Sequence, residues 1–451
     1  IDNIVANAGS SNTEIVDARY DAVNNVTYPT LKDRLDDTSD KIGILSAIQQ
    51  NKLKTVYGIK ADGTDETEKL QNALNNESEI WIYGTIGISS PLQWNGVCNV
   101  RGTGTIKALV DMDKLLTTDN SETYKGGIID RSITLDCNNH ASVGVYIVGK
   151  GIKVHCKIKN FKTYGIQLGY YNSPTMYKAW ETDVSGCEIT GLDNPIDGNG
   201  KGTIPFTSYP SNGIYISYGS TDNEIYQNII KNTKNEHIID NAGSNNIHDN
   251  HVYNYPIQYI DGSYLLPNYC FGVYGATSSF ENNYADSPLL AGFFVKGYSS
   301  KVCNNRILFA KPSFSGNECG VLLDNAVPGL IIQNNLVIRN STINTDLVPY
   351  DVYTSGNIST TSRIENNNGD VLNKFDSKNK HIRASVPAGA TSFKISLGFQ
   401  LTTVDFSVKV MPEWDYGSIY ITSKGLKDIW FSVTKAPTAM SYITVDIDYF
   451  G

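Results

Sequence analysis

The sequence predicts an all-β protein: a right-handed parallel β-helix, preceded by a short helical or coiled-coil segment and followed by an antiparallel β-sandwich. Three observations predict it: a repeat with a basic period of 22 residues, a second short element that alternates with it, and a change of pattern near residue 382. One turn of a parallel β-solenoid needs about 22 residues. A leucine-rich or ankyrin solenoid would add helical periodicity between strands, which is missing here.

The first repeated element reads apolar-polar-polar-Asn. Its Asn residues fall 22, 33, 22, 30 and 32 positions apart, so loops lengthen some coils. Asn tolerates left-handed backbone and can pair its amide with the coil above. We therefore expect a stacked corner at Asn228, Asn250, Asn283, Asn305, Asn335 and Asn367.

The second element reads Gly-apolar-polar-apolar, as in Gly144–Ile147 and Gly213–Ile216. The two elements alternate along the chain, as expected of short strands whose side chains point alternately inward and outward. Together they predict a β-helix domain over residues 56–368.

Residues 1–55 have no core of their own and are expected to form a connector. Two short heptads offer either a coiled-coil seam or one amphipathic surface helix. In the next helix, Asp65 and Glu68 are expected to form a capping box. The predicted seam is Leu31, Leu35, Thr38, Ile42, Leu45 and Gln49.

The C-terminal region, residues 369–451, is predicted to be a separate trimerisation or capping domain. A polar linker at 366–380 leads into longer alternating runs, among them 393–397 and 442–447, which are typical of an antiparallel sandwich. A β-helix has an open end, and a terminal domain would cover it.

Composition excludes several functions. A net charge of −9 leaves no basic surface for nucleic acid or anionic membrane, and no apolar run is long enough to span a bilayer. The first residue opens no signal peptide, so we expect a protein without membrane insertion. The seven cysteines lack metal-ligand or redox spacing, so we expect free, buried thiols, with no metal and no cofactor.

Four carboxylates are the first candidates for catalysis. Aligning two neighbouring coils places Glu181 over Asp222 and Asp183 over Glu224. Adjacent coils lie about 4.8 Å apart. Two carboxyl groups at so short a distance raise the pKa of one of them, which gives one acid beside one ionised base. A separation of about 5 Å between the two carboxyl groups suits a retaining glycosidase, and a wider separation leaves room for an attacking water. If the substrate is a phosphodiester, the same groups would act as general acid and base.

Two alternatives stay open for these residues. Carboxylates on a solvated β-helix face are common, and Lys153 or Lys178 would neutralise them. A second, less favoured catalytic set is Glu236, His237 and Asp240 with Asp261 from the following loop.

Aromatic side chains cluster around the same coils. Several lie in inserted loops, and aromatic faces with polar tips suit sugar rings. Other tyrosines at repeat positions would only cover the sheet. The candidates for substrate binding are Tyr170, Tyr171, Tyr177, Trp180, Tyr209, Tyr218, Tyr255, Tyr259 and Tyr264.

Two segments carry a family resemblance. Residues 57–74 (YGIKADGTDETEKLQNAL) resemble the first segment of pectate-lyase-like β-helix proteins, and residues 9–35 resemble the connector of phage tailspike and appendage proteins. The resemblance implies a homotrimer in the virion that contacts other tail proteins through its N-terminal segment. It implies binding, and often cleavage, of capsule, O-antigen or teichoic acid on the host surface. It transfers no catalytic residue.

We therefore expect a tailspike that hydrolytically depolymerises a bacterial surface glycan. The main rival is a non-catalytic adhesin that uses the same aromatic face. A free polysaccharide lyase is a third possibility, but it would need an outward Arg or Lys base near a calcium-binding Asp cluster, and we find none in the sequence.

Overall fold

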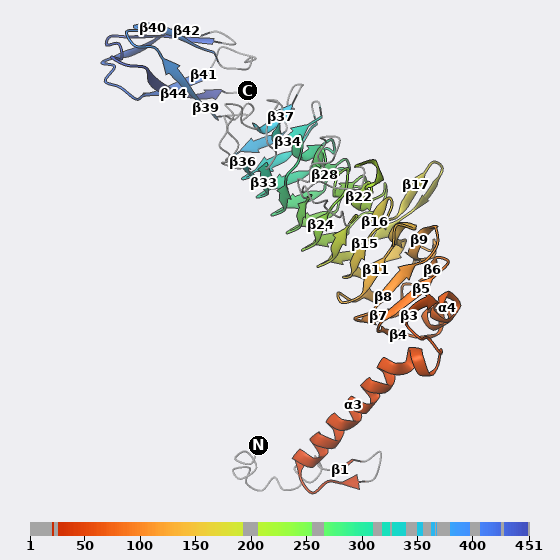
Figure 1. Ribbon diagram of the computed structural model, residues 1–451. Coiled ribbons are helices and arrows are strands. Elements are labelled where there is room, and N and C mark those ends of the chain that lie inside the picture. Colours follow the sequence, from red (N-terminus) through yellow and green to blue (C-terminus); the bar gives the residue numbers. More distant parts are fainter. Residues whose placement is uncertain are drawn as a thin grey trace, which may run out of the picture.

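A computed structural model describes residues 20–21, 26–192, 206–254, 266–309, 318–324, 327–339, 350–354, 362–365, 367, 379–396, 406–424 and 428–449. Most of these residues form a parallel β-helix, whose coils stack along one axis (Figure 1). Each coil passes through three parallel sheets in turn, here called sheets 1, 2 and 3. The predicted solenoid is confirmed.

Sheet 1 contains β4 (Glu79–Ile82), β7 (Asn99–Gly102), β10 (Ile128–Ile129), β14 (Lys153–Val154), β20 (Asp183–Ser185), β23 (Glu224–Tyr226), β26 (Asn246–His248), β29 (Ser279–Glu281), β32 (Lys301–Cys303), β35 (Ile331–Gln333) and β38 (Arg363–Glu365). Sheet 2 contains β3 (Asp62–Asp65), β5 (Thr85–Ile88), β8 (Thr105–Ala108), β11 (Thr134–Asp136), β15 (Lys157–Lys159), β21 (Glu188–Thr190), β24 (Ile229–Lys231), β27 (His251–Tyr253), β30 (Tyr284–Asp286), β33 (Arg306–Phe309) and β36 (Leu336–Arg339).

Sheet 3 contains β6 (Leu92–Gln93), β9 (Met112–Thr117), β12 (Ala141–Ile147), β16 (Tyr164–Leu168), β22 (Asn212–Ile216), β25 (Ile238–Asp240), β28 (Tyr269–Val273), β31 (Ala291–Val295), β34 (Cys319–Leu323) and β37 (Tyr350–Thr354). Small additions are the pairs β1 (Tyr20–Asp21) with β2 (Val26–Thr27), β13 (Gly149–Lys150) with β19 (Ala179–Trp180) and β17 (Tyr170–Asn172) with β18 (Thr175–Tyr177), and the 3-10 turn Phe206–Ser208.

One apolar core runs through the solenoid. Inward side chains such as Ile225, Ile247 and Phe280 are fully buried and stack coil on coil. The seven cysteines are buried, unpaired thiols, as predicted. Among the described residues, no helix has the length and hydrophobicity to cross a bilayer.

The predicted Asn ladder is present at the corner between sheets 1 and 2. Asn283 shows the pattern: its Oδ1 accepts from the backbone N–H and the Nδ2 of Asn250, at 3.1 and 3.0 Å. Its Nδ2 donates to the carbonyl of Ile247 and to Oδ1 of Asn305, at 2.9 and 3.1 Å. Because every atom of the amide is used, this one side chain satisfies groups on three successive coils.

The left-handed residue at this corner is the one before each ladder Asn. Positive φ angles fall on Gln227 (54°), Asp249 (55°) and Asn282 (55°). The expectation that the ladder Asn itself adopts this conformation was therefore wrong: the ladder residue points inward and its exposed neighbour makes the bend.

A second ladder, which the sequence did not predict, lies at the corner between sheets 3 and 1. The N–H of Asn223 donates to Oδ1 of Asn245, whose own N–H donates to Oγ of Ser278, at 3.0 and 3.2 Å. The Ser278 N–H in turn reaches Oγ of Ser300 at 3.3 Å. In part of this ladder, Ser hydroxyl groups accept the backbone N–H groups in place of Asn side chains.

The N-terminal part consists of α3 (Leu31–Thr55) and α4 (Thr67–Asn76), the latter closing the first coil with buried Leu70, Ala73 and Leu74. The predicted capping box at Asp65 and Glu68 was wrong. Asp65 accepts from Thr67, and the N-cap residue Glu66 instead accepts the N–H groups of Lys60 and Ala61. A capping box does occur at Thr30 and Asp33, at the start of α3.

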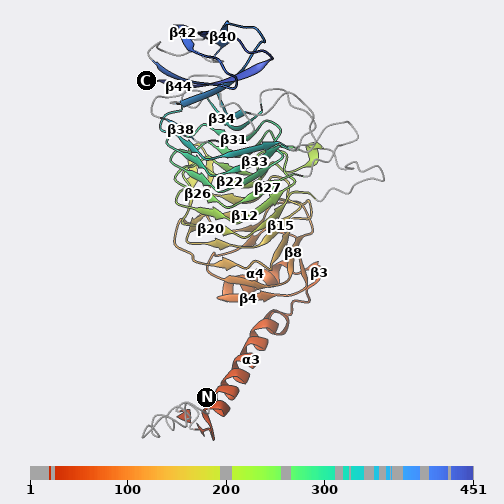
Figure 2. The ribbon, with the colours of Figure 1, turned by 90° about the vertical axis from the view of Figure 1, so that its left-hand side faces the viewer.

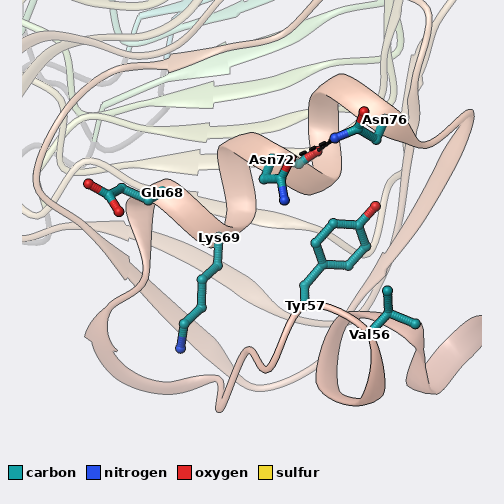
Figure 3. A pocket seen from close by; sticks show the side chains of 6 residues that line it. All are labelled: Val56, Tyr57, Glu68, Lys69, Asn72 and Asn76. Atoms are coloured by element: carbon teal, nitrogen blue, oxygen red, sulfur yellow. Dashed lines mark hydrogen bonds between the residues drawn. The ribbon is translucent and has the colours of Figure 1, made fainter.

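The residues after α3 lie against α4 around a hollow of about 580 Å³ (Figure 3). Figure 3 shows Tyr57 facing the helix from below. Its hydroxyl donates to Glu77 at 2.6 Å, which raises the pKa of Tyr57 to about 12, and Lys52 also pairs with Glu77 at 2.5 Å. These contacts fix the end of α3 on the first coil.

Two antiparallel sheets form the C-terminal unit, and they share a core that includes Phe393, Phe431 and Val445. Figure 2 shows it at the opposite end of the solenoid from α3. Its sheets are β39 (Asn379–Val386), β44 (Ser441–Tyr449) and β41 (Phe406–Pro412), and β40 (Ser392–Ser396), β43 (Asp428–Val433) and β42 (Ile419–Lys424). Most of the predicted linker at 366–380 lies outside the described residues.

Replacing Asn283 by Ala tests the ladder. The change leaves the buried amide of Asn250 without its acceptor, so we expect unfolding to become easier by about 3 kcal/mol, measured by denaturant titration. Asn282→Gly is the matched control, because Gly suits the positive φ of its exposed neighbour, and it should stay within about 1 kcal/mol of the parent. Equal losses in both variants would contradict the ladder's role.

Candidate functional site

The predicted alignment of the carboxylates is the one observed. Asp183 of β20 pairs in register with Glu224 of β23, so Glu181 and Asp222 occupy one position of the preceding corner. At that corner both residues have positive φ, 49° and 59°. Asp is among the residues that tolerate this conformation, whereas Glu is unusual there.

Other coils place small residues at this corner position. In the two preceding coils the position is held by Gly126 and Gly151, since Ile128, Lys153 and Asp183 follow one another in register. Glu181 is therefore a charged residue at a strained backbone position that Gly fills elsewhere, and such strain is frequent at functional sites.

The four carboxylates have different surroundings. Glu181 forms an ion pair with Lys150 at 2.6 Å, rather than with Lys153 or Lys178. Asp222 accepts from the hydroxyl of Thr221 at 2.9 Å.

Asp183 is half-buried and accepts from the hydroxyl of Tyr226 at 3.3 Å through Oδ2. Its Oδ1 is buried without a hydrogen-bond partner among the described residues. A buried carboxylate oxygen without a donor is costly, and fold stability does not explain why Asp183 occupies this position.

Glu224 is half-exposed and held on one side only. Its Oε2 accepts from Nδ2 of Asn246 at 2.9 Å and lies 3.3 Å from Nε2 of His248. The other ring nitrogen of His248, Nδ1, lies 2.8 Å from Asp249. The His248 ring also stacks on Tyr226, with centroids 5.1 Å apart.

Glu224 and Asp222 line a shallow hollow of about 390 Å³ on the outside of sheet 1. Its other walls are Asn223 of the same coil and polar residues of the next two coils: Ser244, Asn245, Asn246, Thr277 and Ser279. A hollow lined by carboxylates, amides and hydroxyls suits a ligand rich in hydroxyl groups.

Several of the predicted aromatic side chains lie near this corner. The hairpin of β17 and β18 carries Tyr170, Tyr171 and Tyr177, and the Tyr171 ring lies 5.1 Å from that of Tyr218. Trp180 directly precedes Glu181, with Lys178 5.8 Å from its ring. Tyr170, Tyr171 and Tyr218 are 37%, 48% and 56% exposed, so part of this aromatic cluster is open to solvent.

Of the remaining predicted aromatic residues, only Tyr209 lies within the described part of the chain. Tyr209 is buried, with 1% of its surface exposed. Tyr255, Tyr259 and Tyr264 lie outside the described residues, as does Asp261.

The three described members of the second catalytic set, Glu236, His237 and Asp240, do not gather on the surface. Glu236 accepts from the hydroxyl of Tyr274 at 2.8 Å, while His237 and Asp240 are fully buried. Burial raises the pKa of Asp240, which accepts from Ala242 N, Asn245 Nδ2 and the Ser278 hydroxyl. These contacts make Asp240 part of the second ladder.

The sequence did not predict the contacts of Tyr226 with Asp183 and of His248 with Glu224, nor the contact of Asp249 with His248. The signal was there: Tyr226 and His248 both occupy the second position of the apolar-polar-polar-Asn repeat, which stacks on sheet 1 one strand apart. The prediction of the coils rested on the first and fourth positions of the repeat. The second position, which points outward, did not enter it.

No family model and no curated protein sequence matches the chain. Several solved structures are similar to it. One is an alginate lyase from Paenibacillus sp. str. FPU-7, with 12% identity and a TM-score of 0.39; the match covers 68% of this chain and 94% of that one. A tailspike protein of E. coli bacteriophage HK620, solved with a pentasaccharide, matches at 10% identity and a TM-score of 0.43 over 85% and 90% of the two chains. A tailspike of Acinetobacter baumannii bacteriophage Fri1, described as a capsular polysaccharide depolymerase, matches at 9% identity and a TM-score of 0.34. The match covers 86% of this chain and 83% of that one.

These similar structures include phage tailspikes and a polysaccharide lyase. The fold itself is defined by the three parallel sheets. Among the described residues, no group of three or more His, Cys, Asp or Glu side chains is arranged to hold a metal ion.

Buried His237 should make the protein sensitive to acid. Burial lowers its pKa from 6.5 to about 4, so the unfolded chain takes up a proton that the folded protein cannot. Stability is therefore complete above about pH 6.5 and is lost as the pH falls towards 4, by up to about 3 kcal/mol.

Denaturant unfolding of the parent and of His237→Gln at pH 7 and pH 4.5 measures this effect. Gln keeps a donor for Asn254, which accepts from His237 Nε2 at 3.0 Å, but takes up no proton. The variant should lose a few kcal/mol less between the two pH values. An identical pH dependence would contradict this role of His237.

Proposed function

We propose that the chain is a tailspike-type protein that binds a bacterial surface polysaccharide and cleaves it hydrolytically with Asp183 and Glu224. The observation that carries the proposal is the in-register position of these two carboxylates on adjacent strands. Exposed Tyr171 and Tyr218 lie in the connections that lead into these strands. Adjacent strands lie about 4.8 Å apart, close to the roughly 5 Å separation of the carboxyl groups in retaining glycosidases.

In this proposal one carboxylic acid protonates the leaving oxygen while the other carboxylate attacks the anomeric carbon. Water then releases the sugar and returns the proton, so the net reaction adds one water across the bond. Glu181 and Asp222, at the edge of the same face, would hydrogen-bond the glycan. Capsule and O-antigen are the substrate classes proposed for this step. In wall teichoic acid, a phosphodiester polymer, the same two groups would instead act as general acid and general base.

The sequence resemblance to phage appendage proteins supports the rest of the assignment. Residues 1–55 would connect the protein to other tail proteins of the virion, 56–368 would carry the site, and 369–451 would cap the solenoid and help to form a homotrimer. The second candidate function is a non-catalytic adhesin, which the exposed aromatic residues alone would serve.

Depolymerisation is tested with the purified protein and surface glycans from a panel of bacteria, following polymer size by chromatography. We expect one glycan to be shortened with new reducing ends, and Asp183→Asn/Glu224→Gln to bind it while cutting at least about 100-fold more slowly. Glu188→Gln is the control, because Glu188 pairs with Lys157 and Lys231 on sheet 2, away from the site. Binding without shortening by the parent protein would favour the adhesin, and unsaturated ends a lyase.

Trimer formation is tested by light scattering. The full chain should have three times its 49.5 kDa mass, and Leu35→Asp should shift it towards monomer because Leu35, in the proposed seam of α3, is 50% exposed in one chain. Asp36→Asn, off the seam, should leave the mass unchanged. A monomeric parent protein would contradict the trimer.

A further inference from the structure

Tyr124 lies in the connection from β9 to β10, at the corner between sheets 3 and 1. The sequence did not single it out. Its side chain is 72% exposed, more than any of the tyrosines described above. Because an aromatic ring stabilises a fold chiefly through the area that it buries, so exposed a ring adds little to the stability of the solenoid.

The ring of Tyr124 lies against two glycines of this corner. A Cβ atom at Gly151 would lie 2.4 Å from Cε2 of the ring, and one at Gly126 would lie 3.1 Å from Cε1. Both glycines have positive φ, 77° and 74°. Since a side chain at Gly151 would occupy the place of the ring, the bare backbone of the corner supports the tyrosine on one side and leaves most of it open to solvent.

The segment that carries this ring is fixed to the following coils. The N–H of Lys125 donates to the carbonyl of Lys150 at 2.9 Å, and the N–H of Lys150 donates to the carbonyl of Thr123 at 3.0 Å. Oε1 of Glu122 accepts from the N–H of Lys178 at 2.9 Å. A ring on a backbone held in this way loses little conformational entropy when it binds a ligand.

Tyr124 is also in line with the candidate site. It forms a parallel bridge with Lys150, which is in register with Trp180 of the next coil. Glu181 follows Trp180, and its carboxylate pairs with Nζ of Lys150 at 2.6 Å. Adjacent coils lie about 4.8 Å apart, so roughly 10 Å separates the backbone of Tyr124 from that of Trp180. A ligand that extends along this corner can therefore touch the Tyr124 ring and Glu181 together.

The chemistry of this surface suits a sugar. An aromatic ring binds the C–H face of a sugar ring, and its hydroxyl group provides a polar tip. Lys150 and Glu181 offer a donor and an acceptor to the sugar's hydroxyl groups. A flat apolar ring with a few fixed polar groups beside it is the combination that orients a ligand in a binding site.

We propose that Tyr124 is a sugar-binding platform of the candidate site, and that the glycan runs along the corner from the hollow on sheet 1, over Glu181, to this ring. The inference rests on the proposed binding of a polysaccharide and not on its cleavage. Tyr124 lies two coils before Asp183, so it would contact a sugar further along the chain than the bond to be broken. Its role is to hold the polymer and to favour long chains over short ones.

Binding is measured in the Asp183→Asn/Glu224→Gln background, which keeps the glycan intact. The protein is immobilised, and the probe is a size-fractionated series of fragments of the surface polysaccharide that the parent binds in the panel. We expect Tyr124→Ala to weaken binding of the long fragments roughly 10-fold, whereas Tyr124→Phe, which keeps the ring, should change it by less than about 2-fold. The shortest fragments that bind should bind equally to the parent and to both variants.

Two results would overturn the platform and leave the proposed function in place. One is unchanged binding of the long fragments by Tyr124→Ala. The other is an equal loss in Tyr124→Ala and Tyr124→Phe, which would assign the effect to the hydroxyl group and not to the ring.

The matched control is Tyr298→Ala. Tyr298 is 58% exposed and lies at the same corner beyond the other end of the hollow, where its carbonyl accepts the N–H of Thr277 at 2.9 Å. This variant should bind every fragment as the parent does. A loss in Tyr298→Ala with none in Tyr124→Ala would place the glycan on the opposite side of the hollow and contradict the proposed path. Thermal unfolding of each variant checks that the fold is intact.

The parent protein separates failure of this inference from failure of the proposed function. If the parent binds no glycan of the panel, the proposed function is refuted, and the platform with it. If it binds a glycan and never cuts it, hydrolysis is refuted and the binding test of Tyr124 still decides. If it cuts the glycan, Tyr124→Ala in the active protein should raise KM about 10-fold with kcat within about 2-fold, and a loss confined to kcat would overturn the holding role.

Discussion

The in-register stacking of coils is the constraint on which the rest of this structure depends. Every residue of a coil has a counterpart about 4.8 Å away on the next one, so a buried polar group at a corner must find its partner there. The Asn228–Asn250–Asn283 ladder meets this demand because one amide both donates and accepts. The same stacking turns each outward position into a column of side chains, and the carboxylates, the Tyr226–His248 stack and the polar hollow are parts of such columns.

The two tight corners solve the bend differently. Between sheets 1 and 2, a residue with positive φ precedes a ladder Asn in coil after coil. Between sheets 3 and 1, the left-handed position passes from Gly151 to Glu181 and Asp222 before it returns to small residues. A charged residue at this position costs roughly 1 kcal/mol or more in backbone strain. At Glu181 the ion pair with Lys150 offsets part of this cost.

Much of the fold could be predicted from the sequence because the residues at buried positions repeat in a regular pattern. The ladder Asn residues and the apolar residues three positions before them mark the register, and that register correctly placed Asp183 beside Glu224. Outward positions carry no such pattern, so the contact of His248 with Glu224 was not predicted. Burial of Tyr209, His237 and Asp240 depends on what lies on neighbouring coils and loops, which a local pattern does not encode. The capping box predicted at Asp65 and Glu68 was wrong for a similar reason. The N-cap residue is Glu66, and its carboxylate accepts the N–H groups of residues 60 and 61 from a neighbouring segment.

The corner between sheets 2 and 3 has a different consequence, one for how such a protein can diversify. From β20 onward, the step from sheet 1 to sheet 2 has one fixed length, as from Tyr226 to Ile229 and from Cys303 to Arg306. The step from sheet 2 to sheet 3 varies widely: β21 ends at Thr190 and β22 begins at Asn212, whereas β24 ends at Lys231 and β25 begins at Ile238. Insertions and deletions at this one corner leave the register of every other column unchanged. Evolution can therefore exchange whole loops along one edge of the solenoid, and with them the surface shown to a host, while the polar columns on sheet 1 keep their geometry.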